Sequence, residues 1–327
     1  MINPQRDQAV LPKRRRTESL EGSKAKTGLE TSVKLPLAFA LTVYLAHNPD
    51  LSALTPEQAT DHYERWGRAE GRVCSTITGR TDFLALVPRR SRLLEIGPYT
   101  APAFRKPGYN VCYLDAFTSA ELRAKAAATG MDAAGVPEID YVWHGEEYAE
   151  LIHERMAAVF SSHNIEHQPD LIRHLRQLHR ILKPSGRLFF AIPDRRYCFD
   201  HYIPDTNFAD VFGAYYEARQ RHTAASIFEH RMLTTHNEAG RHWAGDHGPP
   251  PLAQPLNEER IAIVHETMRR IEASPGYIDT HAWQFTPHSF RALIDTLALS
   301  GMIPFRTERV YETIQGSNEF YAVLKAA

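Results

Sequence analysis

Beyond Arg72 the chain alternates short apolar segments with helical segments, and this alternation constrains its fold more than any other feature. Strands are predicted at about 92–96, 110–114, 140–143, 157–161 and 187–192. Strands that alternate with helices form a parallel sheet with helices on both faces. A polar turn at 315–318, between apolar segments at 303–311 and 320–324, predicts a final antiparallel hairpin. The sequence therefore predicts an α/β, doubly wound, mostly parallel sheet.

The segments before and within this pattern suggest further regions. Residues 1–33 hold a run of four basic residues among polar ones, and we expect a disordered tail there. Residues 34–74 are expected to form a small helical module, and residues 75–327 the main domain. A mostly helical insertion is predicted after the fifth strand, at about 200–284.

Two helices are expected in the small module. Leu37, Phe39 and Ala40 recur with later apolar residues at helical spacing, which predicts a helix within 35–48. Thr55, followed by proline, is expected to cap a second helix that ends near Gly67.

In the main domain, a helix is expected to open at Pro169, after the fourth strand.

Net charge and composition limit the classes of partner and the cellular compartment that we expect for this protein. The chain has 38 Lys and Arg against 39 Asp and Glu, so no overall field favours nucleic acid or an anionic membrane. Its longest apolar run is shorter than the roughly 20 residues that cross a bilayer. Three scattered cysteines form no disulfide framework, which fits a reducing compartment. We expect a cytoplasmic protein without nucleic-acid or membrane partners.

A nucleoside site is predicted where the first two strands end. Glu95-Ile96-Gly97-Pro98 closes the first strand, and Asp115 closes the second, 20 residues after Glu95. A carboxylate at that position accepts hydrogen bonds from ribose hydroxyls. Neither the dinucleotide pattern G-x-G-x-x-G nor the P-loop pattern is present at this loop. An adenosine ligand without phosphates, S-adenosylmethionine, is therefore the expected cofactor.

The chain resembles the class I S-adenosylmethionine-dependent methyltransferases. The matching strings are R-L-L-E-I-G-P at 92–98, V-F-S-S-H-N-I-E-H at 159–167 and L-K-P-S-G-R-L at 182–188, together with Asp115. The resemblance implies a Rossmann-like, seven-stranded sheet in the order 3-2-1-4-5-7-6. The family's E-x-G-x-G-x-G is reduced here to Glu95 and Gly97. P-D-R-R-Y at 193–197 is similar to a bacterial subgroup of this family.

The resemblance also implies a set of site residues. The cofactor-binding residues would be Glu95, Gly97, Pro98 and Tyr99 at the methionine part, Asp115 and Ala116 at the ribose, His144 and Gly145 at the adenine edge, and Ser162 and His163 closing the site. The catalytic candidates are Tyr197, His163 and Asp194. Each of these three could position the acceptor or move a proton.

The expected function is methyl transfer by in-line displacement to a small-molecule or glycan-type acceptor. The glycan alternative comes from the helical module, whose strings at 44–51 and 62–72 resemble modules beside glycan-modifying domains. One alternative is a cyclising enzyme, similar to azetidine-2-carboxylate synthases, in which the amino group of S-adenosylmethionine displaces methylthioadenosine and no other substrate is needed. A second alternative is a non-catalytic binding protein. A homodimer is possible in each case.

Histidine-rich patterns raise the question of a metal. His163, Glu166 and His167 match the H-x-x-E-H pattern of inverted zinc peptidases. That chemistry needs both histidines on one α-helical face, whereas this segment leaves a strand and precedes Pro169. The histidines of the insertion match no compact metal motif and are interpreted as surface or pocket groups, of which one or two could be acid/base groups. No metal is expected from the sequence.

Overall fold

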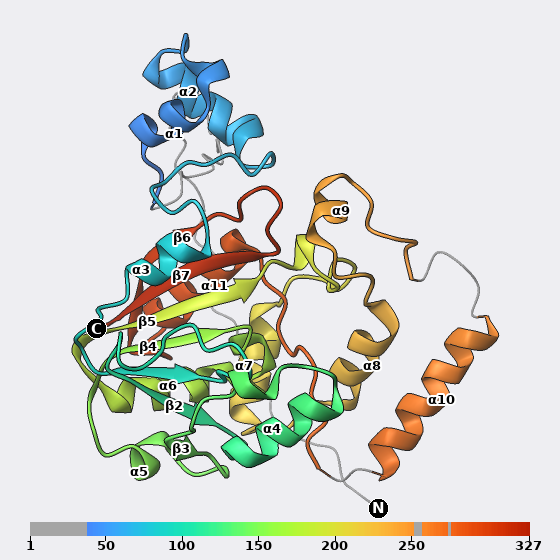
Figure 1. The fold of residues 1–327 in the computed structure, drawn as a ribbon. Coiled ribbons are helices and arrows are strands. Elements are labelled where there is room, and N and C mark those ends of the chain that lie inside the picture. Colours follow the sequence, from blue (N-terminus) through green and yellow to red (C-terminus); the bar gives the residue numbers. More distant parts are fainter. Residues whose placement is uncertain (1–37, 252–256, 274–275) are drawn as a thin grey trace, which may run out of the picture. The chain divides into compact units, whose positions relative to one another are not determined.

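The computed structural model describes residues 38–251, 257–273 and 276–327. Seven strands form one sheet in the order β3-β2-β1-β4-β5-β7-β6, which confirms the predicted fold class and strand order (Figure 1). The strands are β1 (Leu93–Ile96), β2 (Val111–Asp115), β3 (Tyr141–Val142), β4 (Met156–Ser162), β5 (Leu182–Pro193), β6 (Phe305–Tyr311) and β7 (Glu319–Ala326). Only β7 runs antiparallel to its neighbours, β5 and β6. The predicted tail at 1–33 lies outside the described residues.

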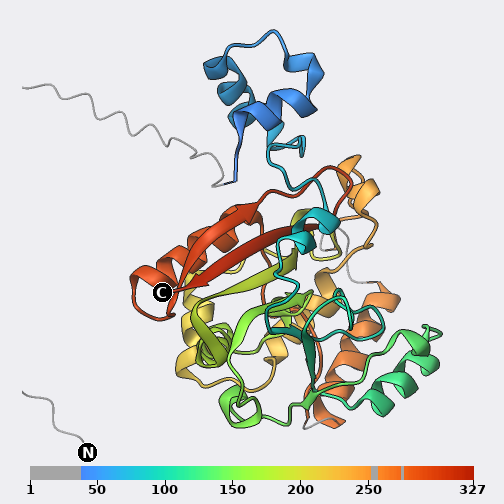
Figure 2. The same ribbon diagram turned by 60° about the vertical axis from the view of Figure 1, so that its left-hand side comes forward.

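Helices lie on both faces of the sheet (Figure 1 and Figure 2). The α-helices after residue 75 are α3 (Arg80–Ala85), α4 (Ser119–Ala128), α5 (Tyr148–Leu151), α6 (Leu171–Ile181), α7 (Phe208–Tyr216), α8 (Ala224–Leu233), α9 (Ala239–Trp243), α10 (Glu258–Ala273) and α11 (Pro287–Leu299). Helices α7 to α10 follow β5, where the helical insertion was predicted. No helix among the described residues is both long and apolar enough to cross a membrane.

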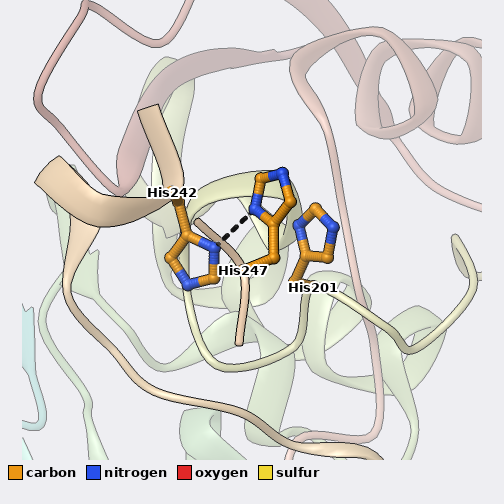
Figure 3. A group of neighbouring side chains, drawn as sticks. All are labelled: His201, His242 and His247. Carbon is orange, nitrogen blue, oxygen red and sulfur yellow. Dashed lines mark hydrogen bonds between the residues drawn. The ribbon is translucent and has the colours of Figure 1, made fainter. Parts of the chain in front are cut away.

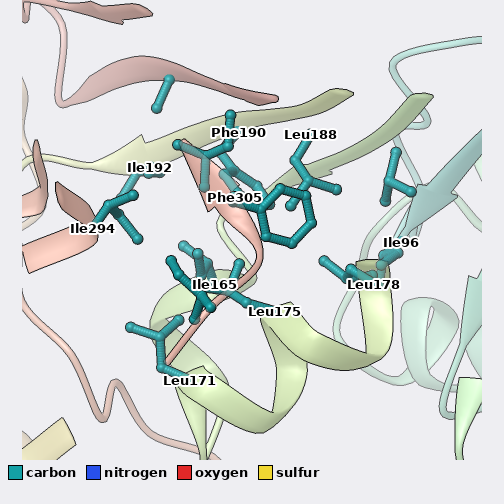
Figure 4. Close-up of a cluster of buried hydrophobic side chains, with 14 of the residues drawn as sticks. Ile96, Ile165, Leu171, Leu175, Leu178, Leu188, Phe190, Ile192, Ile294 and Phe305 are labelled. Atoms are coloured by element: carbon teal, nitrogen blue, oxygen red, sulfur yellow. The ribbon is translucent and has the colours of Figure 1, made fainter. Parts of the chain in front are cut away.

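Two apolar clusters, one on each face, hold the sheet. Successive side chains of a strand point to opposite faces, so Leu188 and Phe190 of β5 join one cluster and Phe189 joins the other. The larger cluster packs α6 and α11 against the sheet, and Figure 4 shows Leu175 of α6 and Ile294 of α11 within it. Strand β1 is buried throughout and β4 at most of its positions, which explains the near-continuous apolar runs in the sequence there.

Two helix starts differ from the prediction. Helix α1 spans Leu41–His47, so Phe39 and Ala40 precede it. Ala40 is extended because its amide donates a 2.8 Å hydrogen bond to the Cys74 carbonyl, a tertiary contact that apolar spacing does not report. Helix α6 begins after Pro169, because the Asp170 side chain accepts the Arg173 amide and acts as the N-cap. Helix α2 (Pro56–His62) starts as predicted, and a π-helical turn extends it to Gly67.

Candidate active site at the carboxyl edge of the sheet

The loop after β1 begins with unusual backbone conformations. Gly97 has a φ of +67° and Tyr99 a φ of +42°, and the first of these is the left-handed conformation that glycine adopts without strain. The Gly97 amide donates a 2.9 Å hydrogen bond to the carbonyl of Leu114 on β2. Pro98, between the two, is buried. The loop therefore starts directly beside the end of β2.

The Glu95 side chain organises this same loop. It is buried and accepts hydrogen bonds from the backbone amides of Ala103, at 2.6 Å, and Phe104, at 3.1 Å. Burial raises the pKa of Glu95 to about 7, although both amide hydrogen bonds favour its charged form. Both oxygens are engaged by the connection between β1 and β2, so the contacts of Glu95 give it a positioning role in that loop.

Asp115 ends β2 beside this loop. Its carboxylate is half-buried, and Oδ1 accepts a 3.1 Å hydrogen bond from the Phe117 amide. Burial raises the pKa of Asp115, against the hydrogen bonds that favour its charged form. Ala116 and Phe117 are exposed, and Lys125 Nζ lies 5.4 Å from the centroid of the Phe117 ring. A carboxylate that can accept hydrogen bonds from hydroxyls and an exposed aromatic ring thus lie at one strand tip.

The residues predicted at the adenine edge follow β3. The Trp143 amide donates a 2.8 Å hydrogen bond to the Asp115 carbonyl, so this loop starts next to Asp115. His144 and Gly145 are exposed, and the His144 amide donates to the Glu146 carboxylate at 2.8 Å. The structure thus brings His144 and Gly145 to the same edge as Asp115.

A connected polar group lies at the end of β4. His163, with a φ of +47°, places Nε2 3.0 Å from Oε2 of Glu319. Arg80 donates to the same oxygen at 2.6 Å and to Ser162 Oγ at 2.7 Å, and the Tyr321 hydroxyl donates to Glu319 Oε1 at 2.9 Å. Burial by itself raises the pKa of Glu319, but the His163 hydrogen bond and the Arg80 charge outweigh it and lower that pKa. His163 therefore has an ionised partner.

The other two catalytic candidates follow β5. Asp194 is fully buried; both of its oxygens contact the Arg196 guanidinium, and Oδ2 also accepts the Thr313 hydroxyl at 2.5 Å. The Tyr197 ring stacks on Trp243 with a centroid distance of 3.8 Å and an interplanar angle of 9°. The Arg196 guanidinium lies 5.0 Å from the Tyr197 centroid, and burial raises the pKa of Tyr197. Asp194 is thus engaged in internal contacts, and Tyr197 keeps its proton.

Three residues of this edge were missed by the sequence interpretation: Arg80, Glu319 and Trp243. The hairpin prediction held a signal for Glu319, because an antiparallel β7 returns to the carboxyl edge and pairs Glu319 with Pro193. Trp243 comes from α9 in the insertion, and its indole donates to the Ser317 carbonyl at 2.8 Å. Arg80 precedes all the strands, and no local pattern marks it.

Two groups of side chains among the described residues bring possible metal ligands within 4.8 Å of one another. One consists of His201, His242 and His247 (Figure 3), and the other of Glu166, His167 and His281. The H-x-x-E-H segment contributes only two members of the second group. Its residues Ile165–His167 form a short 3₁₀ turn, so the two histidines of the motif do not share an α-helical face.

A family model described as a methyltransferase domain matches residues 66–247. The chain belongs to this family. The predicted resemblance to S-adenosylmethionine-dependent methyltransferases is thereby confirmed, and the match supports an enzyme of that class. No curated protein matches the chain.

Three solved structures similar to this methyltransferase share little sequence with it. A Mesorhizobium loti S-adenosylmethionine-dependent methyltransferase is 14% identical, with a TM-score of 0.37, over 76% of this chain and 98% of that one. The Streptomyces caelestis methyltransferase CcbJ is 12% identical, with a TM-score of 0.36, over 75% of this chain and 92% of that one. A Rhodobacter sphaeroides protein whose description names a Zn-dependent alcohol dehydrogenase is 15% identical, with a TM-score of 0.41, over 81% and 94%.

Proposed function

We propose that this methyltransferase binds S-adenosylmethionine across the tips of β1 and β2 and methylates a small-molecule or glycan-type acceptor. The observation that carries the proposal is the hydrogen bond from the Gly97 amide to the Leu114 carbonyl. It joins a loop with left-handed backbone directly to the strand that ends in Asp115. Open α/β sheets bind ligands just beyond such carboxyl ends.

The residues at this edge fit that cofactor. Asp115 would accept hydrogen bonds from both ribose hydroxyls, and the exposed Phe117 ring would cover one face of the adenine. Backbone groups around Gly97 would approach the methionine part, and Glu95 would hold their loop in place. When bound, S-adenosylmethionine supplies an electrophilic methyl group on a positively charged sulfur.

His163 is the group best suited to remove a proton from the acceptor. The ionised Glu319 carboxylate keeps a proton on His163 Nε2 and leaves the lone pair on Nδ1. The imidazole is also 39% exposed, so an acceptor can reach it. Tyr197 would donate a hydrogen bond that orients the acceptor, because its raised pKa keeps it protonated. Asp194 is not proposed as the base, since it is buried against Arg196.

The test combines cofactor binding with product analysis. Calorimetric titration with S-adenosylmethionine should show one site per chain. Incubation with a panel of phenols, amines, sugars and oligosaccharides should then yield S-adenosylhomocysteine only when a suitable acceptor is present, as followed by mass spectrometry. Release of methylthioadenosine without any acceptor would instead support the cyclising alternative. Absence of binding would contradict the proposal and leave a non-catalytic binding protein.

A further inference from the structure

The side chain of Glu166 is buried without a hydrogen-bond partner. It is 0% exposed, and neither carboxylate oxygen accepts a hydrogen bond from any described residue. Its backbone is firmly placed, because its carbonyl accepts the amides of Ala282, at 2.7 Å, and Trp283, at 3.2 Å. Burying a carboxylate without a partner is costly, so a group that neutralises it is expected at this position.

Two imidazole nitrogens face this carboxylate. His167 Nε2 lies 3.8 Å and His281 Nε2 3.9 Å from Glu166 Oε1. These distances are too long for hydrogen bonds. Two ligands bound at about 2.0–2.1 Å to one tetrahedral ion stand about 3.3 Å apart, so shifts of about half an ångström would bring either nitrogen and Oε1 to that spacing. The three atoms all lie within 4.8 Å of one another.

The outer nitrogens of both histidines are held by carboxylates. His167 Nδ1 lies 2.9 Å from Asp279 Oδ1, and His281 Nδ1 lies 2.5 Å from Asp200 Oδ2. Such contacts fix the tautomer with a proton on Nδ1 and direct the Nε2 lone pair inward, toward Glu166. A carboxylate behind the imidazole is the usual arrangement around metal-bound histidines. Two such pairs that converge on one orphaned carboxylate are hard to explain as core packing.

We propose that Glu166, His167 and His281 bind one divalent transition-metal ion, with Zn²⁺ as the reference metal. Two histidines and one carboxylate suit Zn²⁺ or Fe²⁺ and leave coordination positions open to water or substrate. Buried polar atoms near His281 would then find partners in the waters of such a site, since Asp200 Oδ1 and His230 Nδ1 have none among the described residues. The proposal revises the sequence-based expectation that no metal is bound.

The site lies next to the proposed base. His163 Nδ1 is 4.0 Å from the same Glu166 oxygen that faces His167 and His281. A metal there would place positive charge close to the nitrogen that carries the lone pair. It would also leave an open coordination position near the acceptor. The metal site does not depend on methyl transfer, because it is argued from Glu166 and its neighbours alone.

The second histidine group lacks these features and serves as an internal comparison. His242 Nδ1 lies 3.0 Å from His247 Nδ1, as the dashed line in Figure 3 marks, and His242 Nε2 lies 3.0 Å from the His236 carbonyl. His201 Nδ1 contacts the Arg196 carbonyl at 2.8 Å, and its ring stacks on His247 at 3.7 Å. These contacts account for the group as a stacked hydrogen-bonding cluster, and stacked rings direct their nitrogens along parallel planes rather than toward one ion.

The test measures metal binding by the full-length protein. The protein is stripped with a chelator, dialysed, and titrated with Zn²⁺ by calorimetry; bound metal is then counted by mass spectrometry. We expect about one Zn²⁺ per chain, and a thermal unfolding midpoint that rises when Zn²⁺ is added. Glu166→Gln should lose at least 100-fold in affinity and show no such rise. His247→Gln, the matched control from the other group, should bind as the wild type does.

A milder variant covers the case in which Glu166→Gln folds poorly. Asp200→Asn keeps all three ligands and should weaken Zn²⁺ binding about 10- to 100-fold, the usual effect of losing a carboxylate behind a metal-bound histidine. Circular dichroism checks that each variant is folded. The proposal is overturned if the wild type binds none of Zn²⁺, Co²⁺, Mn²⁺ and Fe²⁺. Loss of binding in His247→Gln with retention in the folded Glu166→Gln or Asp200→Asn variant would overturn it equally.

Discussion

Nε2 of His163 lies 3.0 Å from Oε2 of Glu319, so a histidine at the tip of β4 is paired with the first residue of β7. The same oxygen accepts Arg80, which helps to keep the carboxylate ionised. An ionised partner at Nε2 keeps the proton on that nitrogen and fixes the orientation of the ring. Neither effect requires Glu319 to touch the acceptor, which makes Glu319 a positioning residue.

The contact between His163 and Glu319 predicts a large loss of activity when His163 is replaced and a smaller loss when Glu319 is replaced. His163→Ala should lower kcat by about 10²- to 10⁴-fold, the usual contribution of a general base, with the Kd for S-adenosylmethionine little changed. Glu319→Gln should lower kcat less. The Kd for S-adenosylmethionine should again be little changed, because Glu319 acts by orienting His163.

The control for Glu319→Gln is Glu308→Gln on β6. Glu308 is likewise a carboxylate paired with an arginine, Arg187, at 2.6 Å, but it contacts no proposed site residue among those described. Its kcat should match that of the wild type. Identical kcat values for the wild type and Glu319→Gln would remove the pair from the mechanism.

The lowered pKa of Glu319 also predicts a pH-dependent stability. Its pKa is lower in the folded chain than in the unfolded chain, so the unfolded chain binds more protons between the two values. The contribution of Glu319 to the free energy of unfolding is therefore complete above about pH 5 and is lost as the pH falls through the folded pKa. Urea unfolding of the wild type and Glu319→Gln at several pH values should show a difference that shrinks in acid. A difference independent of pH would contradict the shift.

Asp115 should dominate recognition of the ribose. Asp115→Ala removes the acceptor for two hydroxyls and should weaken S-adenosylmethionine binding by at least about tenfold, since hydrogen bonds to a charged group contribute about 1.5–3 kcal/mol each. Asp115→Asn keeps one carbonyl oxygen and should weaken it less. Asp132→Ala is the matched control, because Asp132 also accepts a nearby amide but caps a short turn after α4. Calorimetry that shows equal affinity for the wild type and Asp115→Ala would exclude the assignment.

The parts of the fold that depend on local sequence patterns could be predicted from the sequence. The strand β1 and its neighbours are short and buried, so their apolar runs locate them, and the resemblance supplied their order. The start of α1 was wrong because the Cys74 carbonyl, distant in sequence, holds Ala40 in an extended conformation. Apolar spacing carries no information about such a contact.

The candidate site likewise contains some residues that sequence patterns locate and others that they do not. Gly97 and Asp115 end neighbouring strands, so their proximity follows from a parallel sheet once its order is known. Arg80 and His281 reach the carboxyl edge and its surroundings from segments with no recognisable motif. The H-x-x-E-H string was not interpreted as a metal site, and the ligand set proposed above differs from it, because His163 contacts Glu319 and His281 faces Glu166 in its place.

Variants of Glu95 test whether this residue positions the loop after β1 or contacts the cofactor directly. Glu95→Ala leaves the amides of Ala103 and Phe104 without their acceptor, and each loss in a buried setting costs about 1–3 kcal/mol. We expect the free energy of unfolding to fall by about 2–6 kcal/mol. Affinity for S-adenosylmethionine should fall with it, because the loop after β1 loses its support. Urea unfolding and calorimetry measure the two effects.

The control is Glu95→Gln, whose side-chain carbonyl still accepts one of the two amides. It should therefore lose about half as much stability as Glu95→Ala and keep most of the cofactor affinity. A Gln variant that is stable yet fails to bind S-adenosylmethionine would show that the charge of Glu95 contacts the cofactor directly. Because Glu95 is 3% exposed and both of its carboxylate oxygens are engaged, we expect the cofactor affinity to follow the stability instead. Both should fall strongly in Glu95→Ala and only partly in Glu95→Gln.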